Sequence, residues 1–231
     1  MKIIHLNYSS WPDHASEIIS RNISTCLHES RNNSTPSCNI FITGGNTVKG
    51  LYHSLGKNKI LNGDNHINFY LTDERLPQNN HDNSVERNDE TCYKYLLNNI
   101  KNKNINFQPI IKNNFDSNKI KCLYEKIIPN IIDIVILSLG ADGHIASIFP
   151  HNLQTYENFF QFLMLTECEN HKYQRLSITY KLLYQAKCIY IIAIGENKKS
   201  IFDKILVGDF ENTSISKELA LKATWITTFP S

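Results

Sequence analysis

Short apolar runs alternate with amphipathic segments along the chain and predict alternating strands and helices. Runs of strand length occur at residues 2–6, 39–43, 67–71, 131–139, 188–194 and 224–228. Helix-like spacing of apolar residues occurs at residues 14–29, 47–55, 88–98, 117–128 and 198–206. The run at 131–139 is apolar at nearly every position, as in a strand that is covered on both faces. The alternation predicts an α/β fold, a largely parallel Rossmann-like sheet with helices on both faces.

Smaller features add detail to this prediction. Asp13 is expected to cap the first helix, and residues 176–180 are expected to form an edge strand. A further helix is expected to begin beyond His144. No Pro- or Gly-rich linker divides the chain, so we expect one domain over residues 1–231.

Charge and apolar content exclude several classes of partner. The net charge is +2, and no basic run or recognition motif is present, so no nucleic-acid partner is expected. No stretch approaches the roughly 20 apolar residues of a membrane-spanning helix, so no membrane partner is expected either. A small anionic ligand needs only a local cluster of cations, which net charge does not exclude. The oligomeric state is left open between a monomer and a small homo-oligomer.

The cysteines and the N-terminus indicate a cytoplasmic location. The six cysteines are isolated, and none forms a Cys-x-x-Cys pair, so no metal site is expected. Residues 1–13 lack the apolar run of a signal peptide. We therefore expect reduced thiols in a cytosol.

Polar clusters directly follow several predicted strands. They are Thr43-Gly44-Gly45-Asn46, Asp73-Glu74-Arg75, Asp142-Gly143-His144 and Gly195-Glu196-Asn197-Lys198. In a parallel sheet the carboxyl ends of the strands share one edge, and ligands bind in the crevice outside it. These clusters are therefore expected to converge into one site.

The first cluster suits a phosphate group. Gly44 and Gly45 let the backbone approach an anion, and the amides that follow open a helix. Side chains of Thr43, Asn46 and Thr47 add donors. The alternative is a plain strand-to-helix turn, because a Gly-Gly pair alone is weak evidence.

Three cations are candidates for binding the same anion: Arg75, Arg175 and Lys198. An arginine can grip a phosphate with two parallel hydrogen bonds. The alternative for each is an exposed surface charge, which is the usual fate of these residue types.

His144 is the candidate general base, because a histidine titrates near neutral pH and can take a proton from water. Asp142 or Asp73 is expected to orient the histidine or the substrate. A structural histidine bonded to a carbonyl is the alternative. The position of His144 directly after the most buried strand favours the catalytic role over this structural one.

These clusters together resemble the 6-phosphogluconolactonase family, which is related to glucosamine-6-phosphate deaminases. The similarity spans most of the chain. It is carried by residues 40–47, 69–75, 175–179 and 195–198, and most specifically by residues 133–150. The resemblance implies a cofactor-independent hydrolysis of 6-phospho-D-glucono-1,5-lactone to 6-phosphogluconate, within the oxidative pentose phosphate pathway.

Two details favour a lactonase over a deaminase. Arg75 stands where deaminases usually carry an aromatic residue, and residues 147–150 read Ser-Ile-Phe-Pro where deaminases usually place Asn-Glu. A deaminase or isomerase stays an alternative, as does a sugar-phosphate sensor without turnover.

The chain also departs from the family pattern. Thr43, Asn46 and Val48 replace the usual Ser, Ser and Pro of the phosphate loop. The usual Asp-Ser-Asn before the next helix aligns either with residues 82–84 or with Arg87-Asn88.

Overall fold

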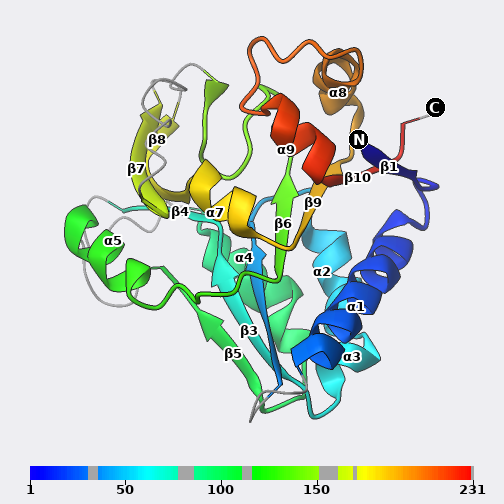
Figure 1. Ribbon diagram of the computed structural model, residues 1–231, viewed down its shortest axis with the longest axis vertical. Coiled ribbons are helices and arrows are strands. Elements are labelled where there is room, and N and C mark those ends of the chain that lie inside the picture. The colour runs from blue at the N-terminus through cyan, green and yellow to red at the C-terminus, as the bar shows by residue number, and fades with distance from the viewer. Residues whose placement is uncertain (31–35, 78–85, 111–115, 151–160, 169–170, 230–231) are drawn as a thin grey trace.

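The structure is a computed structural model that describes residues 1–30, 36–77, 86–110, 116–150, 161–168 and 171–229. Its main sheet has seven strands, all paired in parallel, in the order β1-β10-β9-β6-β2-β3-β5 (Figure 1). The strands are β1 (Lys2–His5), β2 (Ser37–Ile42), β3 (His66–Leu71), β5 (Ile105–Gln108), β6 (Ile134–Ser138), β9 (Cys188–Ala193) and β10 (Thr224–Thr227). The predicted α/β class is confirmed.

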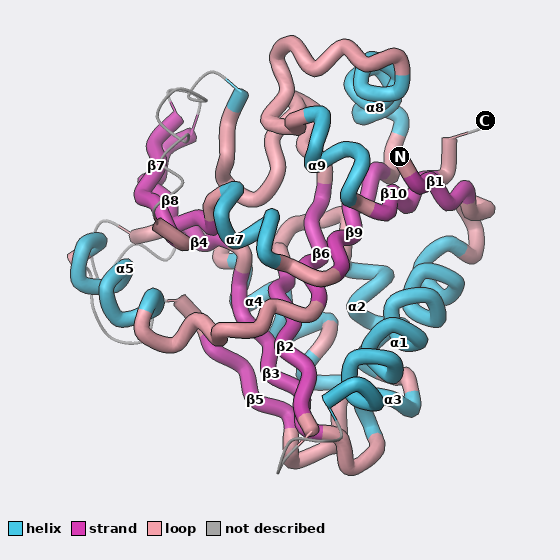
Figure 2. Tube along the Cα trace, viewed as in Figure 1, coloured by secondary structure: helices cyan, strands magenta, loops and turns pink. Residues whose placement is uncertain are grey.

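Helices cover both faces of this sheet (Figure 2). One layer contains α1 (Trp11–Glu29), α2 (Lys49–Gly56), α3 (Lys59–Asn62) and α4 (Asn88–Tyr95), which contact one another. On the other side lie α5 (Ser117–Glu125), α7 (Tyr180–Gln185) and α9 (Lys217–Lys222). Helix α8 (Lys199–Leu206) places Phe202 against Trp225 of β10. Short 3₁₀ turns occur at η2 (Leu97–Asn99) and η4 (Glu196–Lys198).

The order of the strands reverses between β2 and β6. From β2 the chain moves outward through β3 to β5, and then returns to β6 and moves outward through β9 to β10. The carboxyl ends of β2 and β6 lie side by side, because Ile42 pairs with Ile136. Such a reversal opens a crevice for ligands at this edge. The two loops that leave it are the predicted phosphate loop and the predicted histidine turn.

A second, antiparallel sheet stands next to this crevice. Its order is β4-β8-β7, made of β4 (Asp73–Arg75), β8 (His171–Ile178) and β7 (Leu163–Cys168). Thr72 joins the two sheets, since its N–H donates to the carbonyl of Ile42 and its carbonyl accepts from Ile178 at 3.0 and 2.8 Å. The prediction of an edge strand at residues 176–180 is wrong, because β8 is the central strand of this sheet and Tyr180 begins α7.

Two smaller expectations also change. Helix α1 starts at Trp11 with Ser10 as its N-cap residue, so Asp13 does not cap it. Pro12 explains the earlier start, because proline is favoured in a first helical turn. The Asp13 carboxylate instead accepts a 2.5 Å hydrogen bond from Ser54. Residues 145–149 form turns, and residues 151–160, where the further helix was expected, lie outside the described residues.

Candidate active site

A pocket of about 130 Å³ opens at the reversal between β2 and β6. Its walls come from the ends of β2 and β6, from β4 and β8, and from η4. The lining residues are Thr43, Gly44, Gly45, Asp73, Arg75, Asn88, Ser138, Leu139, Gly140, His144, Ala146, Arg175 and Lys198. Eight predicted site residues therefore meet here. Thr47 and Asp142 each bond to a lining residue, whereas Asn46 lines a neighbouring pocket.

His144 is held by Asp142 at the pocket wall. The Nδ1 atom of His144 lies 2.5 Å from Oδ1 of Asp142, and the imidazole ring packs 5.2 Å from the Phe149 ring. Partial burial raises the pKa of Asp142, but the hydrogen bond from His144 and its charge prevail and lower that pKa to about 2. Asp142 is therefore a carboxylate near neutral pH and fixes a proton on Nδ1. The second ring nitrogen is then the one that can accept a proton.

Two glycines make this arrangement possible. A Cβ atom at Gly140 would lie 2.3 Å from Nδ1 of His144 and 2.5 Å from the Asp142 carboxylate. Gly143 has a φ of +83°, which L side chains rarely adopt. Its carbonyl accepts two hydrogen bonds from Ser214, through the backbone N–H at 2.9 Å and the hydroxyl at 3.1 Å. The histidine turn is thus packed closely against Gly140 and hydrogen-bonded to Ser214.

Lys198 supplies a buried cation. Its side chain is 7% exposed, and its ammonium group donates to the hydroxyls of Thr47 at 2.6 Å and Ser138 at 3.1 Å. Within the described residues it forms no ion pair. Burial lowers the pKa of Lys198 to about 8, because the charged form is desolvated. An anion in the pocket would compensate this cost.

Arg75 and Arg175 face each other across two paired strands. They are register partners in the antiparallel pair of β4 and β8, and both line the pocket. Arg175 is buried, donates to the hydroxyl of Ser147 at 3.4 Å and lies 5.5 Å from the Phe149 ring centre. Arg75 forms an ion pair of 3.7 Å with Glu86. Like charges opposite each other destabilise a sheet, so this pair favours a bound anion.

Asp73 is held by hydroxyl groups. Its side chain is 2% exposed and accepts from Thr72 at 2.8 Å, Ser147 at 2.7 Å and Thr43 at 3.4 Å. The structure therefore pairs His144 with Asp142 and not with Asp73. Asp73 instead fixes Thr43, the first residue of the predicted phosphate loop, and Ser147 near Arg175.

The roles of Glu74 and Asn88 were not predicted from the sequence. The carboxylate of Glu74 is fully buried and accepts from the backbone N–H groups of Arg75, Asn88 and Asp89, so it holds the start of α4. Burial and nearby Asp89 raise its pKa to about 8, against these hydrogen bonds. The Asn88 side chain fills the space where a Cβ at Gly44 would lie, 2.1 Å from its Oδ1. Of the two alignments considered, Arg87-Asn88 reaches the site, and residues 82–84 lie outside the described residues.

In the described part of the chain, no group of three or more His, Cys, Asp or Glu residues is placed to hold a metal ion. Among the same residues, no helix combines the length and apolar character needed to cross a bilayer.

The fold and the pocket define a Rossmann-like α/β protein with a pocket lined by three cations at the reversal of strand order. A family model described as glucosamine-6-phosphate isomerases/6-phosphogluconolactonase matches residues 10–219, and the chain belongs to that family. The 6-phosphogluconolactonase of Haemophilus influenzae is 31% identical over 179 residues, which is 75% of each chain.

Solved structures show the same fold. A 6-phosphogluconolactonase from Thermotoga maritima has a TM-score of 0.78 at 23% identity and covers 98% of both chains. A second one, from Shewanella baltica, has a TM-score of 0.81 at 19% identity and covers 98% of this chain and 97% of its own.

Proposed function

We propose that the chain is a 6-phosphogluconolactonase, which hydrolyses 6-phospho-D-glucono-1,5-lactone to 6-phosphogluconate in the oxidative pentose phosphate pathway. The observation that carries this proposal is that a histidine paired with a carboxylate shares one pocket with three cations. The Haemophilus influenzae relative, which is named a 6-phosphogluconolactonase, supports the choice of substrate.

The phosphate group is bound first in this mechanism. Lys198, Arg75 and Arg175 neutralise its charge, and the loop of Thr43, Gly44 and Gly45 contributes backbone and hydroxyl donors. Binding the remote phosphate fixes the ring and removes much of the entropic cost of reaching the transition state. Asn46 lines the neighbouring pocket, so the phosphate site is proposed without it.

His144 then acts as the general base. Its second ring nitrogen takes a proton from water as the water oxygen attacks the lactone carbonyl, and Asp142 stabilises the imidazolium that results. The tetrahedral intermediate collapses with cleavage of the bond to the ring oxygen. The imidazolium returns its proton to that oxygen, which becomes the free hydroxyl of 6-phosphogluconate. No cofactor enters these steps, because a lactone is already an activated ester.

A deaminase or isomerase is the alternative within the family. Ser147 and Phe149 follow the histidine turn, where a deaminase usually carries its glutamate. In this chain Ser147 donates to Asp73 and Phe149 packs on His144 and Arg175, so neither supplies an acid to open a sugar ring. This favours the lactonase. A non-catalytic sensor is disfavoured by the maintained bond between Asp142 and His144.

The direct test is a rate measurement on freshly generated phosphogluconolactone, with the uncatalysed hydrolysis subtracted. Enzyme-dependent hydrolysis is expected. Release of ammonia from glucosamine 6-phosphate without lactone hydrolysis would replace the proposal with a deaminase. Ligand protection from thermal unfolding without either activity would identify a sensor.

The proposed site of action is the cytosol. Five cysteines in the described residues are free thiols: Cys26, Cys38, Cys92, Cys122 and Cys188. Free thiols are typical of a reducing compartment.

A further inference from the structure

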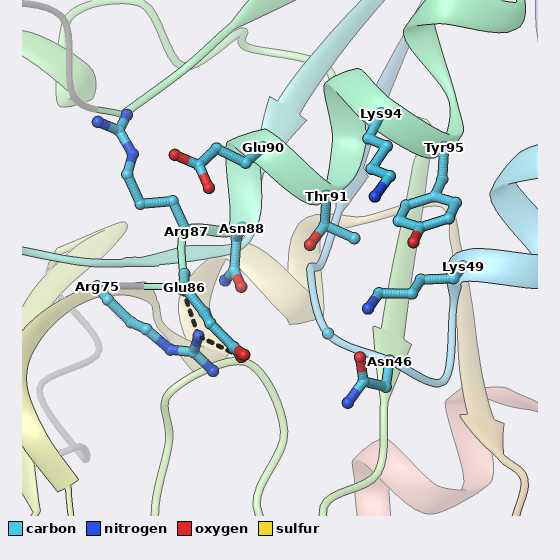
Figure 3. A pocket seen from close by; sticks show the side chains of 11 residues that line it. Asn46, Lys49, Arg75, Glu86, Arg87, Asn88, Glu90, Thr91, Lys94 and Tyr95 are labelled. Carbon is cyan, nitrogen blue, oxygen red and sulfur yellow. Dashed lines mark hydrogen bonds and ion pairs between the residues drawn. The ribbon is translucent and has the colours of Figure 1, made fainter. Parts of the chain in front are cut away.

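A second pocket, of about 290 Å³, lies directly beside the candidate active site. The two pockets share Gly45, Arg75 and Asn88 as a common wall. The remaining wall of the second pocket comes from the start of α2 and from one side of α4 (Figure 3). None of the general-base or phosphate-binding steps proposed above uses this space.

Two lysines from different helices meet at one tyrosine in this pocket. The ammonium group of Lys49 lies 5.3 Å from the centre of the Tyr95 ring, and that of Lys94 lies 5.4 Å from the same centre. Both ammonium groups point into the pocket (Figure 3). Each is attracted to the ring face, but the two positive charges repel each other.

Three of the other four charged residues of the pocket are paired, and the fourth, Glu90, has no ion pair within the described residues. Arg75 contacts Glu86, and Arg87 forms a two-bond ion pair with Asp89. In the described part of the chain neither Lys49 nor Lys94 forms an ion pair. An additional anion would therefore gain the most favourable electrostatic interaction beside Lys49 and Lys94.

The rest of the lining suits hydroxyl groups. Asn46 offers an amide, Thr91 a hydroxyl and Glu90 a carboxylate, all on the pocket wall (Figure 3). These groups donate to and accept from the hydroxyls of a sugar or polyol. The two lysines lie beside Tyr95, with Asn46 and Thr91 near them and Glu90 toward the start of α4 (Figure 3). This lining suits a molecule that places a phosphate at the lysines and hydroxyls along the rest of the wall.

We propose that this pocket is a second binding site, which takes a phosphorylated sugar or sugar acid with its phosphate between Lys49 and Lys94. The site is separate from the catalytic pocket and does not depend on lactone hydrolysis. Asn46, which departs from the usual phosphate loop, contacts the second ligand in this arrangement.

Arg75 couples the two sites. It lines both pockets, and in this structure Glu86 holds it on the side of the second one. An anion near the lysines attracts the same guanidinium group and so competes with a phosphate in the catalytic pocket. Occupation of either site is expected to weaken binding at the other by the same factor, because coupling free energies are reciprocal.

The test is titration calorimetry with 6-phosphogluconate, repeated with inorganic phosphate, on three forms of the full chain. The first is the unsubstituted protein, and the second carries Lys49→Gln with Lys94→Gln. The third carries Lys57→Gln with Lys59→Gln, which removes the same charge at the exposed far end of α2 and in α3. Thermal unfolding of each form checks that it is folded.

Two equivalents of 6-phosphogluconate are expected to bind to the unsubstituted protein and to the Lys57/Lys59 variant. The Lys49/Lys94 variant should keep one site and lose at least tenfold in affinity at the other. Unchanged binding in the Lys49/Lys94 variant, whether the unsubstituted protein takes one equivalent or two, would overturn the proposal. Lactone hydrolysis is measured separately, so a protein without lactonase activity can still show the second site. Binding of inorganic phosphate with equal affinity would mean that the polyol part is not recognised, and would reject the assigned ligand class.

Discussion

The carboxylate of Asp142 and the imidazole of His144 form one unit, with 2.5 Å between Oδ1 and Nδ1. The two residues are separated only by Gly143, whose left-handed backbone turns both side chains to the same side. His144 lines a pocket with three cations, so in the proposed mechanism a substrate held by its phosphate would meet a base of defined orientation.

Replacing His144 with Gln should abolish most of the catalysis. A general base typically contributes roughly 10²–10⁴ in rate, and kcat should fall by about that factor. Binding of 6-phosphogluconate should change little, because the cations are intact. Unchanged hydrolysis, after subtraction of the background, would reject His144 as the base.

Gly140→Ala should displace the Asp142–His144 pair while leaving both side chains unchanged. The added Cβ would lie 2.3 Å from His144 Nδ1, so the ring or Asp142 must move. We expect a loss of about tenfold or more in kcat, since small misplacements of catalytic groups are costly. Gly63→Ala is the matched control, because its Cβ would meet neighbours only at 3.5 Å. Equal activity in the two variants would contradict the prediction.

Phosphate affinity should depend on the proton of Lys198. Burial lowers the pKa of this lysine to about 8, so the free protein loses the charge as the pH rises through that value. A bound anion favours the charged form. Affinity should therefore be greatest below pH 8 and decline above it. In Lys198→Arg the charge persists at high pH, and the decline should disappear. A decline of the same size in both proteins, measured by titration with inorganic phosphate, would exclude Lys198 as its source.

Phosphate should also stabilise the fold through Arg75 and Arg175. At a phosphate concentration of 100 times Kd, binding adds about 2.7 kcal/mol, or roughly 5–10 °C in Tm. Arg175→Met retains an apolar stem against Phe149 but removes one of the two opposed charges. Its phosphate-dependent shift should fall by at least half in a thermal unfolding series. A full shift in this variant would place the anion elsewhere.

The stability of the ligand-free fold should depend on Glu74. Burial raises the pKa of Glu74 to about 8, from a usual value of 4.5. Between these values the folded protein binds a proton that the unfolded chain releases. The contribution of Glu74 is thus fully present below pH 4.5 and is lost as the pH rises toward 8. Urea unfolding is measured from pH 5 to 8.5. With rising pH, the free energy of unfolding of the Glu74→Gln variant should fall less steeply than that of the unsubstituted protein. Parallel curves would refute this assignment.

Six of the seven strands of the main sheet were predicted because they follow from local sequence patterns, whereas the short edge strand β5 was not. The run at residues 131–139 is apolar at all positions but Asp133 and Ser138, and it contains the buried strand β6. Once the strands are parallel, the clusters at Thr43, Asp73 and His144 must share an edge. The boundaries moved by a few residues, as at Ile131, which is 51% exposed and precedes β6.

The second sheet could not be predicted in the same way. Strand β4 has three charged residues and no apolar signal, and it pairs with residues about a hundred positions later in the chain. The opposition of Arg75 and Arg175 depends on that distant register. The role of Glu74 depends on where α4 begins, and local periodicity does not fix the orientation of a carboxylate.

The backbone bonds of Thr72 have a consequence for substrate choice. They tie the wall with Arg75 and Arg175 to the strand that leads into the phosphate loop, so these parts cannot move apart without breaking two hydrogen bonds. In the proposed mechanism the arginines and the phosphate loop therefore hold the anion as one unit, and the distance from that unit to the imidazole limits the length of a substrate. A lactone with one carbon fewer, shorter by about 1.5 Å, would be held just as firmly by its phosphate and would leave its carbonyl short of the base.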